Sequence, residues 1–452
     1  MSNTFAGAQE YNLTGFAYGN TGGGVIPETD PAYIKVYSAL DFATAIRGQN
    51  KYKVIEIMND LVLGWNEIPA EVKEVAGSKM VSHKTPLTHP VLIRTGVSKI
   101  YIDDFKNGLT IFSANGATIK HAALDIRRSN NVIIRNLEFN ELWEWDEKTR
   151  GDYDEQDWDY ITLQDDHKVW IDHCTFHKAY DGIVDMKAGT SGVTISWSMF
   201  KSDDGAANGW VRQQLSAMEA NRSQYPMYDF IRKQGISQVD IAAVVQGHKK
   251  THLVGANPME ASNANLQLTL HHNYYHNAQD RMPRLRAGNA HAFNIMMECS
   301  SNWEVKNRIP PEAAALIAAE GFHFDVISNG SLSTEGGALL LEQSYINGVR
   351  YPLRNNQQSG TPQEYTGKIK AEKIMYILGD LQFNGSSSDP DSPLGPNQAP
   401  IIPFAWNGFT TLPYQYNPEY VPAIINRLNS PTNGAGSGIL IWDRQDWLRT
   451  SY

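Results

Sequence analysis

A nine-residue frame of hydrophobic and polar positions recurs along the middle of the chain. Each copy has an aliphatic residue at positions two and four and an aromatic residue at position nine; the copies are NVIIRNLEF (131–139), KVWIDHCTF (168–176), GVTISWSMF (192–200) and QLTLHHNYY (267–275). The alternation and the Val, Ile and Thr content predict a strand with one face turned inward. The polar residues after position four predict where that strand ends.

Two other segments repeat the frame more loosely, GLTIFSANGATI (108–119) and GALLLEQSYI (337–346). Copies at unequal spacing, with variable material between them, favour a solenoid of short parallel strands whose loops differ in length on one side. A βαβ fold would need a helical pattern between strands, and HKAYDGIVDMKAGTS (177–191) has none. The pattern therefore predicts an all-β chain folded as a parallel β-helix.

Helical patterns interrupt this solenoid at two places. Residues 205–245 alternate polar and apolar positions with a helical period, and residues 311–320 open with proline and are rich in alanine. We interpret 205–245 and 302–336 as insertions or caps, and 386–452 as a C-terminal extension that packs on the solenoid. The expected organisation is one domain over residues 1–452.

Aspartates gather just before two of the predicted strands. Equivalent positions on successive coils of a solenoid lie close together, near the ~4.8 Å strand spacing. Clustered carboxylates without His or Cys form a hard oxygen site that suits calcium rather than zinc. The alternative is that these are turn residues that cap strand ends. The residues in question are Asp157, Asp159, Asp181 and Asp185.

Positive charge is concentrated in DRMPRLRAG (280–288), although the chain carries a formal net charge of -10. Arginine binds carboxylates bidentately, so a chain of carboxylates is one natural partner for such a cluster. The alternative is an arginine that pairs with Asp280 or with the acidic cluster itself. The cations that could share one flank are Lys187, Lys250, Arg281, Arg284 and Arg286.

Four blocks of the sequence together resemble the pectate lyases of polysaccharide lyase family 1, in that family's order. The blocks are DWDYITLQDDHKVWIDHCTF, DGIVDMKAGTSGVTISW, HKKTHLVG and HHNYYHNAQDRMPRLRAGNAH. The resemblance implies a right-handed parallel β-helix, from which the long insertion at 205–245 is a departure. It also implies calcium-dependent β-elimination of α-1,4-linked polygalacturonate, which is de-esterified pectin, to unsaturated oligogalacturonates.

The resemblance also implies residue roles. Asp159, Asp181 and Asp185 match the Ca2+ ligands, with Asp157 as a less certain fourth, and Asp181 stands where the family often has Glu. Arg281 matches the catalytic base and Lys250 the assisting lysine. We place Arg286, Lys187 and Arg284 among the substrate-binding positions, with a structural ion pair as the alternative for Arg284.

Other features set the remaining expectations. The net charge argues against a nucleic-acid partner, and no apolar run approaches the ~20 residues that span a membrane. The start of the chain shows no signal peptide, so the protein is either cytosolic or, as its substrate favours, a secreted monomer whose leader has been removed. Cys174 and Cys299 are expected to be buried free thiols. Rival functions are a pectin lyase that tolerates methyl esters, a β-helical hydrolase and a non-catalytic polysaccharide-binding solenoid.

Overall fold

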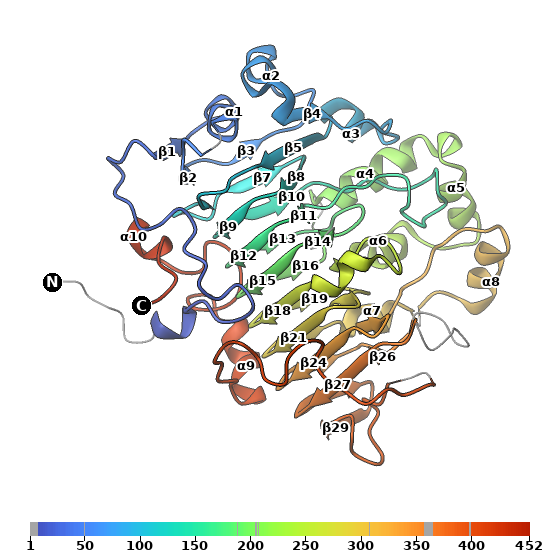
Figure 1. Cartoon of the computed structure of the whole chain (residues 1–452). Helices are drawn as coiled ribbons and strands as arrows, with labels where there is room; N and C mark the ends of the chain where they lie inside the picture. Colours follow the sequence, from blue (N-terminus) through green and yellow to red (C-terminus); the bar gives the residue numbers. More distant parts are fainter. Residues whose placement is uncertain are drawn as a thin grey trace.

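The structure is a computed structural model of the chain, and it describes residues 8–48, 50–187, 189–203, 206, 208–306, 308–356, 365–396 and 399–452. Three long sheets wind around one axis, because the chain visits the third, first and second sheets in turn on each coil (Figure 1). Every strand pair is parallel except β4–β5 and β28–β29 at the two ends. The predicted parallel β-helix is confirmed.

The strands of the three sheets are as follows. The first sheet contains β1 (Tyr33–Val36), β2 (Val54–Ile57), β6 (Leu109–Phe112), β9 (Asn130–Arg135), β12 (His167–Asp172), β15 (Ser191–Ser196), β18 (Gln267–His271), β21 (Asn289–Phe293), β24 (Ala338–Glu342) and β27 (Lys368–Glu372). The second contains β3 (Leu61–Val62), β7 (Thr118–Lys120), β10 (Glu138–Asn140), β13 (Thr175–Phe176), β16 (Met199–Lys201), β19 (Tyr274–His276), β22 (Met296–Glu298), β25 (Tyr345–Asn347), β28 (Ile374–Leu378) and β29 (Leu381–Gly385). The third contains β4 (Met80–Ser82), β5 (Ser98–Asp103), β8 (Ala122–Arg127), β11 (Ile161–Gln164), β14 (Val184–Lys187), β17 (Leu253–Val254), β20 (Arg284–Arg286), β23 (Asn329–Thr334) and β26 (Tyr351–Arg354).

The nine-residue frame corresponds to the register of the stacked coils. Its second and fourth positions pair with their equivalents across β9, β12, β15 and β18, and all of these side chains are buried. The ninth positions form a column in the second sheet, where the ring of Phe176 stacks on Phe139 and Phe200 at centroid distances of 4.9 and 5.3 Å. Position six is the corner between the sheets, because Asn136, His173 and equivalent residues have a positive φ.

Two coils that follow the frame carry weaker sequence signals. In 289–297 the second and fourth positions are Ala290 and Ala292, and in 368–376 they are Ile369 and Ala371. Their register still continues the columns of the first sheet. Alanine fills an inward position but contributes little hydrophobic signal, so the frame search missed both coils.

Helices lie at one end and along the sides of the solenoid (Figure 1). They are α1 (Ala39–Arg47), α2 (Ala70–Ala76), α3 (Pro90–Thr95), α4 (Trp210–Ala220), α5 (Pro226–Lys233), α6 (Gln238–Gln246), α7 (Ser300–Lys306), α8 (Pro311–Ala319), α9 (Val421–Leu428) and α10 (Arg444–Trp447). Among the residues that the structure describes, no helix is long and apolar enough to cross a membrane.

The stretches expected as insertions have these structures. Residues 205–245 contain α4, α5 and most of α6, with Gly205 and Ala207 outside the described residues. Residues 302–336 contain most of α7 and all of α8, but their last part forms β23, which pairs in parallel with β20 and β26. The insertion is therefore shorter than expected, because NGSLST (329–334) returns to the solenoid.

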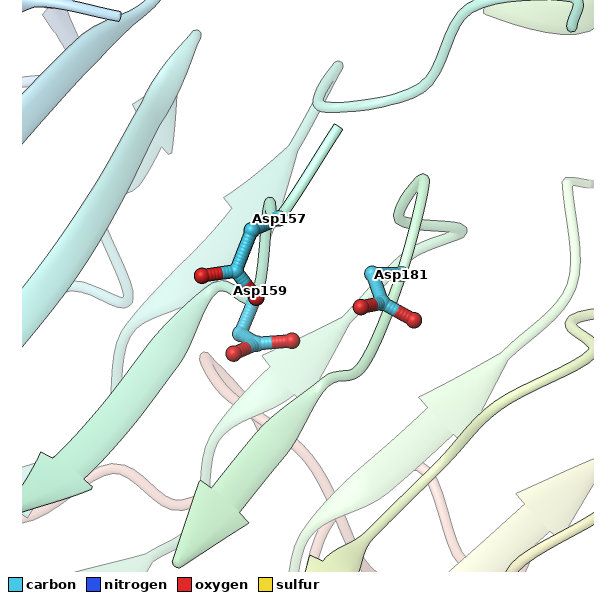
Figure 2. A group of neighbouring side chains, drawn as sticks. All are labelled: Asp157, Asp159 and Asp181. Carbon is cyan, nitrogen blue, oxygen red and sulfur yellow. The ribbon is translucent and has the colours of Figure 1, made fainter. Parts of the chain in front are cut away.

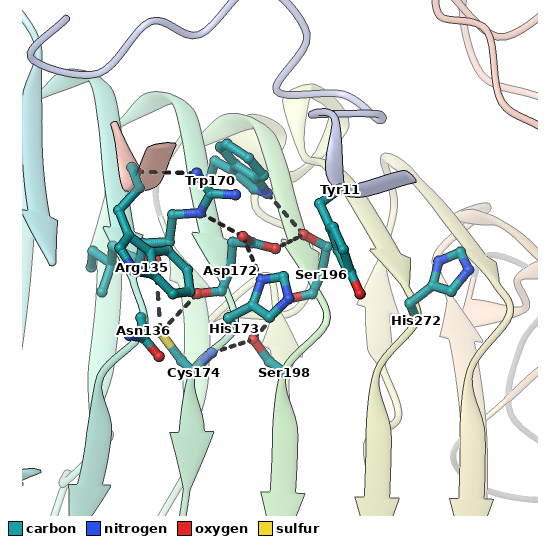
Figure 3. Close-up of polar contacts among 12 residues, drawn as sticks. Tyr11, Arg135, Asn136, Trp170, Asp172, His173, Cys174, Ser196, Ser198 and His272 are labelled. Atoms are coloured by element: carbon teal, nitrogen blue, oxygen red, sulfur yellow. Dashed lines mark hydrogen bonds and ion pairs between the residues drawn. The ribbon is translucent and has the colours of Figure 1, made fainter. Parts of the chain in front are cut away.

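The C-terminal segment returns along the first sheet to the early coils. The buried Arg135 guanidinium donates to the Asp172 carboxylate at 2.6 Å and to the carbonyl of Arg449 at 2.8 Å. Asp172 also accepts from Ser196 at 2.6 Å and lies 2.7 Å from His173 (Figure 3). This buried network ties the end of the chain to β9, β12 and β15. The expected buried free thiols, Cys174 and Cys299, are confirmed.

Candidate active site

The predicted site residues lie on neighbouring coils of the third sheet. Asp157 and Asp159 come just before β11, Asp181 just before β14, Lys250 before β17 and Arg281 before β20. Because β11, β14, β17 and β20 pair in sequence, the segments that lead into them lie side by side. The parallel register therefore brings the acidic and basic stretches together.

Three aspartates form one acidic group. Asp157, Asp159 and Asp181 each offer a carboxylate oxygen, and these oxygens all lie within 4.8 Å of one another (Figure 2). Asp159 is buried and is oriented by the Thr162 hydroxyl, which donates to its Oδ2 at 2.8 Å, and by the Gly182 amide, which donates to its Oδ1 at 2.8 Å. Asp157 is exposed, so the group opens to solvent on one side.

Asp185 lies beside this group, separated from it by a glycine. Its Oδ1 accepts the backbone amide of Leu253 at 3.0 Å, and its side chain is buried. A Cβ placed on Gly182 would lie 2.3 Å from Asp185 Oδ1 and 2.6 Å from Asp159 Oδ1. Only glycine therefore allows these two carboxylates to approach each other on adjacent coils.

Two lysines contact the acidic group. The Lys187 Nζ lies 3.4 Å from Asp157 and 3.5 Å from Asp159. The Lys250 Nζ lies 2.9 Å from Asp181 and 3.2 Å from Asp154, and it donates to the Tyr153 carbonyl at 2.8 Å. An ammonium has three N–H donors; two of those of Lys250 bind Tyr153 and Asp154, and its contact with Asp181 is an ion pair without hydrogen-bond geometry. The Asp154 side chain is 65% exposed, which makes it the contact that a ligand could most easily displace.

The three arginines have different environments. Among the described residues, no carboxylate lies within ion-pair distance of Arg281, whose φ is +63° and whose Nε is buried without a hydrogen bond. Arg286 is nearly buried; it donates to the carbonyl of Ala256 at 2.5 Å and lies 3.6 Å from Glu335. Arg284 is also nearly buried on the same strand. Arg281 therefore differs from Arg286, whose guanidinium has a carboxylate close by.

Burial and mutual repulsion shift the titration of the site. Burial, and then the charge of Asp159, raises the pKa of Asp181 and raises that of Asp185 well above its ordinary value. Burial opposes the charge of Lys187, but Asp159 and Asp185 outweigh it and raise the pKa of the lysine. Burial, followed by the charges of Arg286 and Arg281, lowers the pKa of Arg284 to about 10. The acids repel one another here, and so do the guanidinium groups.

The acidic group suits a hard divalent cation. All of its ligand atoms are carboxylate oxygens, which calcium prefers. The buried Oδ1 of Asp181 accepts no hydrogen bond among the described residues, although Lys250 lies beside it. Burial and then the charge of Asp159 raise the pKa of Asp181, and a bound cation would offset both. Asp157, Asp159 and Asp181 are the residues that would hold it, with Asp185 adjacent.

Sequence reasoning missed three contributors to this geometry, Gly182, Thr162 and Asp154. The glycine in YDGIVD is required because Asp159 and Asp185 approach each other there. This requirement is evident only once the coils are stacked. Asp154 belongs to the loop between β10 and β11, where Asp146 accepts the amides of Thr149 and Tyr153 at 2.8 and 2.9 Å. That loop follows no repeat, so its approach to Lys250 has no sequence signal.

Comparisons with known proteins agree with this architecture. The family model described as pectate lyase matches residues 3–210 and 231–337. The gap between the two matched parts falls in α4 and α5. Pectate lyase B of Paenibacillus amylolyticus is 58% identical over 357 residues, which cover 78% of this chain and 90% of that protein. A pectate trisaccharide-lyase of Thermotoga maritima is 33% identical over 189 residues, which cover 41% of this chain and 38% of that protein.

Solved structures show the same fold. A pectate lyase from Paenibacillus sp. 0602 superposes with a TM-score of 0.96 at 55% identity, covering 98% of this chain and all of that one. A pectate lyase from Bacillus sp. N165 in complex with trigalacturonate has a TM-score of 0.54 at 16% identity, covering 94% and 99% of the two chains, and supports the fold alone. The chain therefore belongs to the pectate lyase family, whose members are polysaccharide lyases.

Proposed function

We propose that this pectate lyase cleaves de-esterified polygalacturonate by calcium-dependent β-elimination. The observation that carries the proposal is that an oxygen-only acidic group lies beside Lys250 and, on the neighbouring coil, Arg281, which has no ion-pair partner among the described residues. A β-helical hydrolase would need an acid and a base, usually two carboxylates, and would not need the arginines. Because pectin lies outside cells, we also propose that the protein is secreted. We propose separately that it acts as a monomer.

In the proposed reaction Arg281 removes the proton from C5 of a galacturonate, next to its carboxyl group. The electron pair of the C5–H bond forms the C4–C5 double bond, and the glycosidic oxygen leaves from C4. Lys250 and Arg286 add positive charge near the substrate carboxylate. Calcium, when bound, would withdraw charge from that carboxylate and stabilise the enolate-like anion.

An arginine base works only after the guanidinium has lost its proton, which it normally keeps at neutral pH. Arg284 and Arg286 share the strand that follows Arg281. Burial is the main cause of the lowered pKa of both, and the charge of Arg281 adds to it. Because the base must lose its proton before it can act, we expect an alkaline optimum.

The direct test is an assay with polygalacturonate at alkaline pH, followed by the ultraviolet absorbance of the unsaturated product. We expect activity that EDTA abolishes and added calcium restores, and near-complete loss in Arg281→Lys. Full turnover in EDTA, or an Arg281→Lys variant that retains most activity, would contradict the mechanism. Activity that requires a methyl-esterified substrate would indicate a pectin lyase. Elimination and hydrolysis both release a reducing end, so new reducing ends without ultraviolet absorbance would indicate a hydrolase. Retention on polygalacturonate without product would indicate a binding protein.

A second readout tests the metal site without activity. Calcium at 100 times its dissociation constant stabilises a folded protein by about 2.7 kcal/mol, so it should raise the melting temperature of the wild type. Asp159→Asn should abolish that rise. Asp165→Asn is the matched control, because Asp165 is exposed at the turn after β11 and lies outside the acidic group.

A further inference from the structure

Cations occupy alternate strands along one row of the third sheet. Gln164 on β11 pairs with Arg127 on β8 and with Lys187 on β14. The neighbouring row continues from β14 to β17 and β20, because Met186 pairs with Val254 and Val254 pairs with Leu285. Arg286 follows Leu285, so it continues the row. Arg127, Lys187 and Arg286 are therefore separated by two strand spacings each, roughly 9.6 Å at ~4.8 Å per strand.

All three cations project from the outer face of the sheet. Their chain neighbours Ile126, Met186 and Leu285 are buried in the core. Side chains alternate between the two faces of a strand, so the residue after each of these apolar positions points outward. Lys187 and Arg286 are the positions that the proposed function assigns to substrate carboxylates, and Arg127 occupies the equivalent place two strands further towards the N-terminal end.

Arg127 belongs to a small cluster with surplus positive charge. Its Nε and Nη2 donate to the two oxygens of Asp125 at 2.6 and 2.5 Å, and the Lys99 Nζ lies 3.2 Å from the same carboxylate. Two cations therefore share one buried aspartate. The guanidinium lies 4.7 Å from the ring centre of Tyr101, and the Arg127 side chain is 30% exposed.

A structural role for Asp125 accounts for only one of these cations. The bidentate contact from Arg127 gives each oxygen of Asp125 one hydrogen bond and neutralises its single charge. Lys99 adds a second positive charge beside the same carboxylate, so the charges of Arg127, Lys99 and Asp125 sum to about +1. Asp125 and Tyr101 hold the guanidinium in place, which lowers the entropy cost of binding a ligand through it.

We propose that Arg127 and Lys99 form a further carboxylate-binding subsite for the uronate chain, on the opposite side of Lys187 from Arg286. The inference rests on the proposed function, because polygalacturonate is the ligand. Each 1,4-linked sugar advances the chain by a distance comparable to the ~4.8 Å strand spacing. A trisaccharide would therefore span Lys187 to Arg286, and only a longer chain would also reach Arg127.

The test compares KM for polygalacturonate with KM for trigalacturonate in wild type and Arg127→Gln. Loss of a partly exposed ion pair is expected to raise KM for the polymer by about 2- to 5-fold, while KM for the trimer stays unchanged. The matched control is Arg128→Gln, because Arg128 is the adjacent arginine, is 45% exposed and pairs with Asp103 and Asp104. It should leave both values unchanged.

A second variant guards against misfolding, because Arg127→Gln weakens the environment of buried Asp125. Lys99→Gln leaves the bidentate pair of Arg127 and Asp125 intact and should also raise KM for the polymer alone. An unchanged polymer KM in both variants, or an equal rise for polymer and trimer, overturns the subsite. A wild-type protein without any unsaturated product would instead refute the proposed function, so the two failures are distinguishable.

Discussion

Lys178 is a buried cation whose replacement by methionine should stabilise the protein at neutral pH. Its side chain is 5% exposed, and its Nζ donates to the carbonyl of Gly247 at 2.7 Å and lies 5.1 Å from the ring centre of Trp143. No carboxylate pairs with it among the described residues. Burial, with the nearby charge of Lys249, lowers its pKa from 10.5 to about 7.

The magnitude and sign follow from that difference. The interval from about 7 to 10.5 corresponds to about 5 kcal/mol, at 1.36 kcal/mol for each pH unit. Between these pH values the unfolded chain holds a proton that folded Lys178 has lost, so stability rises with pH across this window. At pH 7 and below the full cost is present, and near pH 10.5 it disappears.

We therefore expect Lys178→Met to raise the free energy of unfolding at pH 7 by several kcal/mol, after a loss of about 1 kcal/mol for the hydrogen bond to Gly247. Near pH 10 the variant should have no advantage. Guanidinium unfolding followed by tryptophan fluorescence at the two pH values measures the difference, and groups that titrate in both proteins cancel. The exposed Lys84→Met should change little at either pH. A Lys178→Met variant destabilised equally at pH 7 and pH 10 would refute the reasoning.

Three other predictions concern the ring column and the site. Phe176→Ala should cost about 4 kcal/mol, or about 4 °C of melting temperature at about 2.1 cal/mol/K for each of 452 residues; calorimetry measures it, and Phe176→Leu should lose less. Asp154→Asn should lower KM for polygalacturonate about 2- to 5-fold, because a substrate carboxylate no longer displaces a charged partner of Lys250; a raised KM would count against this. Gly182→Ala should reduce kcat/KM at least about ten-fold with folding retained by circular dichroism, because its Cβ displaces Asp159 and Asp185; wild-type kinetics would show that these carboxylates need no fixed position.

The coils with large side chains could be predicted from sequence, because aliphatic residues at positions two and four and an aromatic residue at position nine repeat in each of them. The register of Val132, Val169 and Val193 follows directly from the frame. The coils at 289–297 and 368–376 could not be predicted in this way. Ala290, Ala292 and Ala371 occupy inward positions where neighbouring coils supply the bulk, so burial there depends on the stack and not on the local pattern.

The site shows the same division. Stacking in register explains why acids before β11 and β14 face cations before β17 and β20, and this could be expected from the motifs. The contacts of Lys250 with Asp154 and Tyr153 could not, since the loop between β10 and β11 is shaped by its own hydrogen bonds to Asp146. The position of Asp185 likewise could not be predicted, because its carboxylate accepts the backbone amide of Leu253 on the next coil.

The C-terminal segment has a consequence for how the solenoid unfolds. Stacked repeats contact only their neighbours, and such arrays can fray from either end. Here Arg135 on β9 binds the carbonyl of Arg449, the amide of Gly438 donates to Asn136 at 2.7 Å, and the amide of Gly436 donates to the carbonyl of Trp197 at 2.8 Å. The last residues of the chain thus bind coils formed more than 200 residues earlier. Their release would have to precede the separation of these coils, so the central coils that carry the acidic group should open together, as a single cooperative unit.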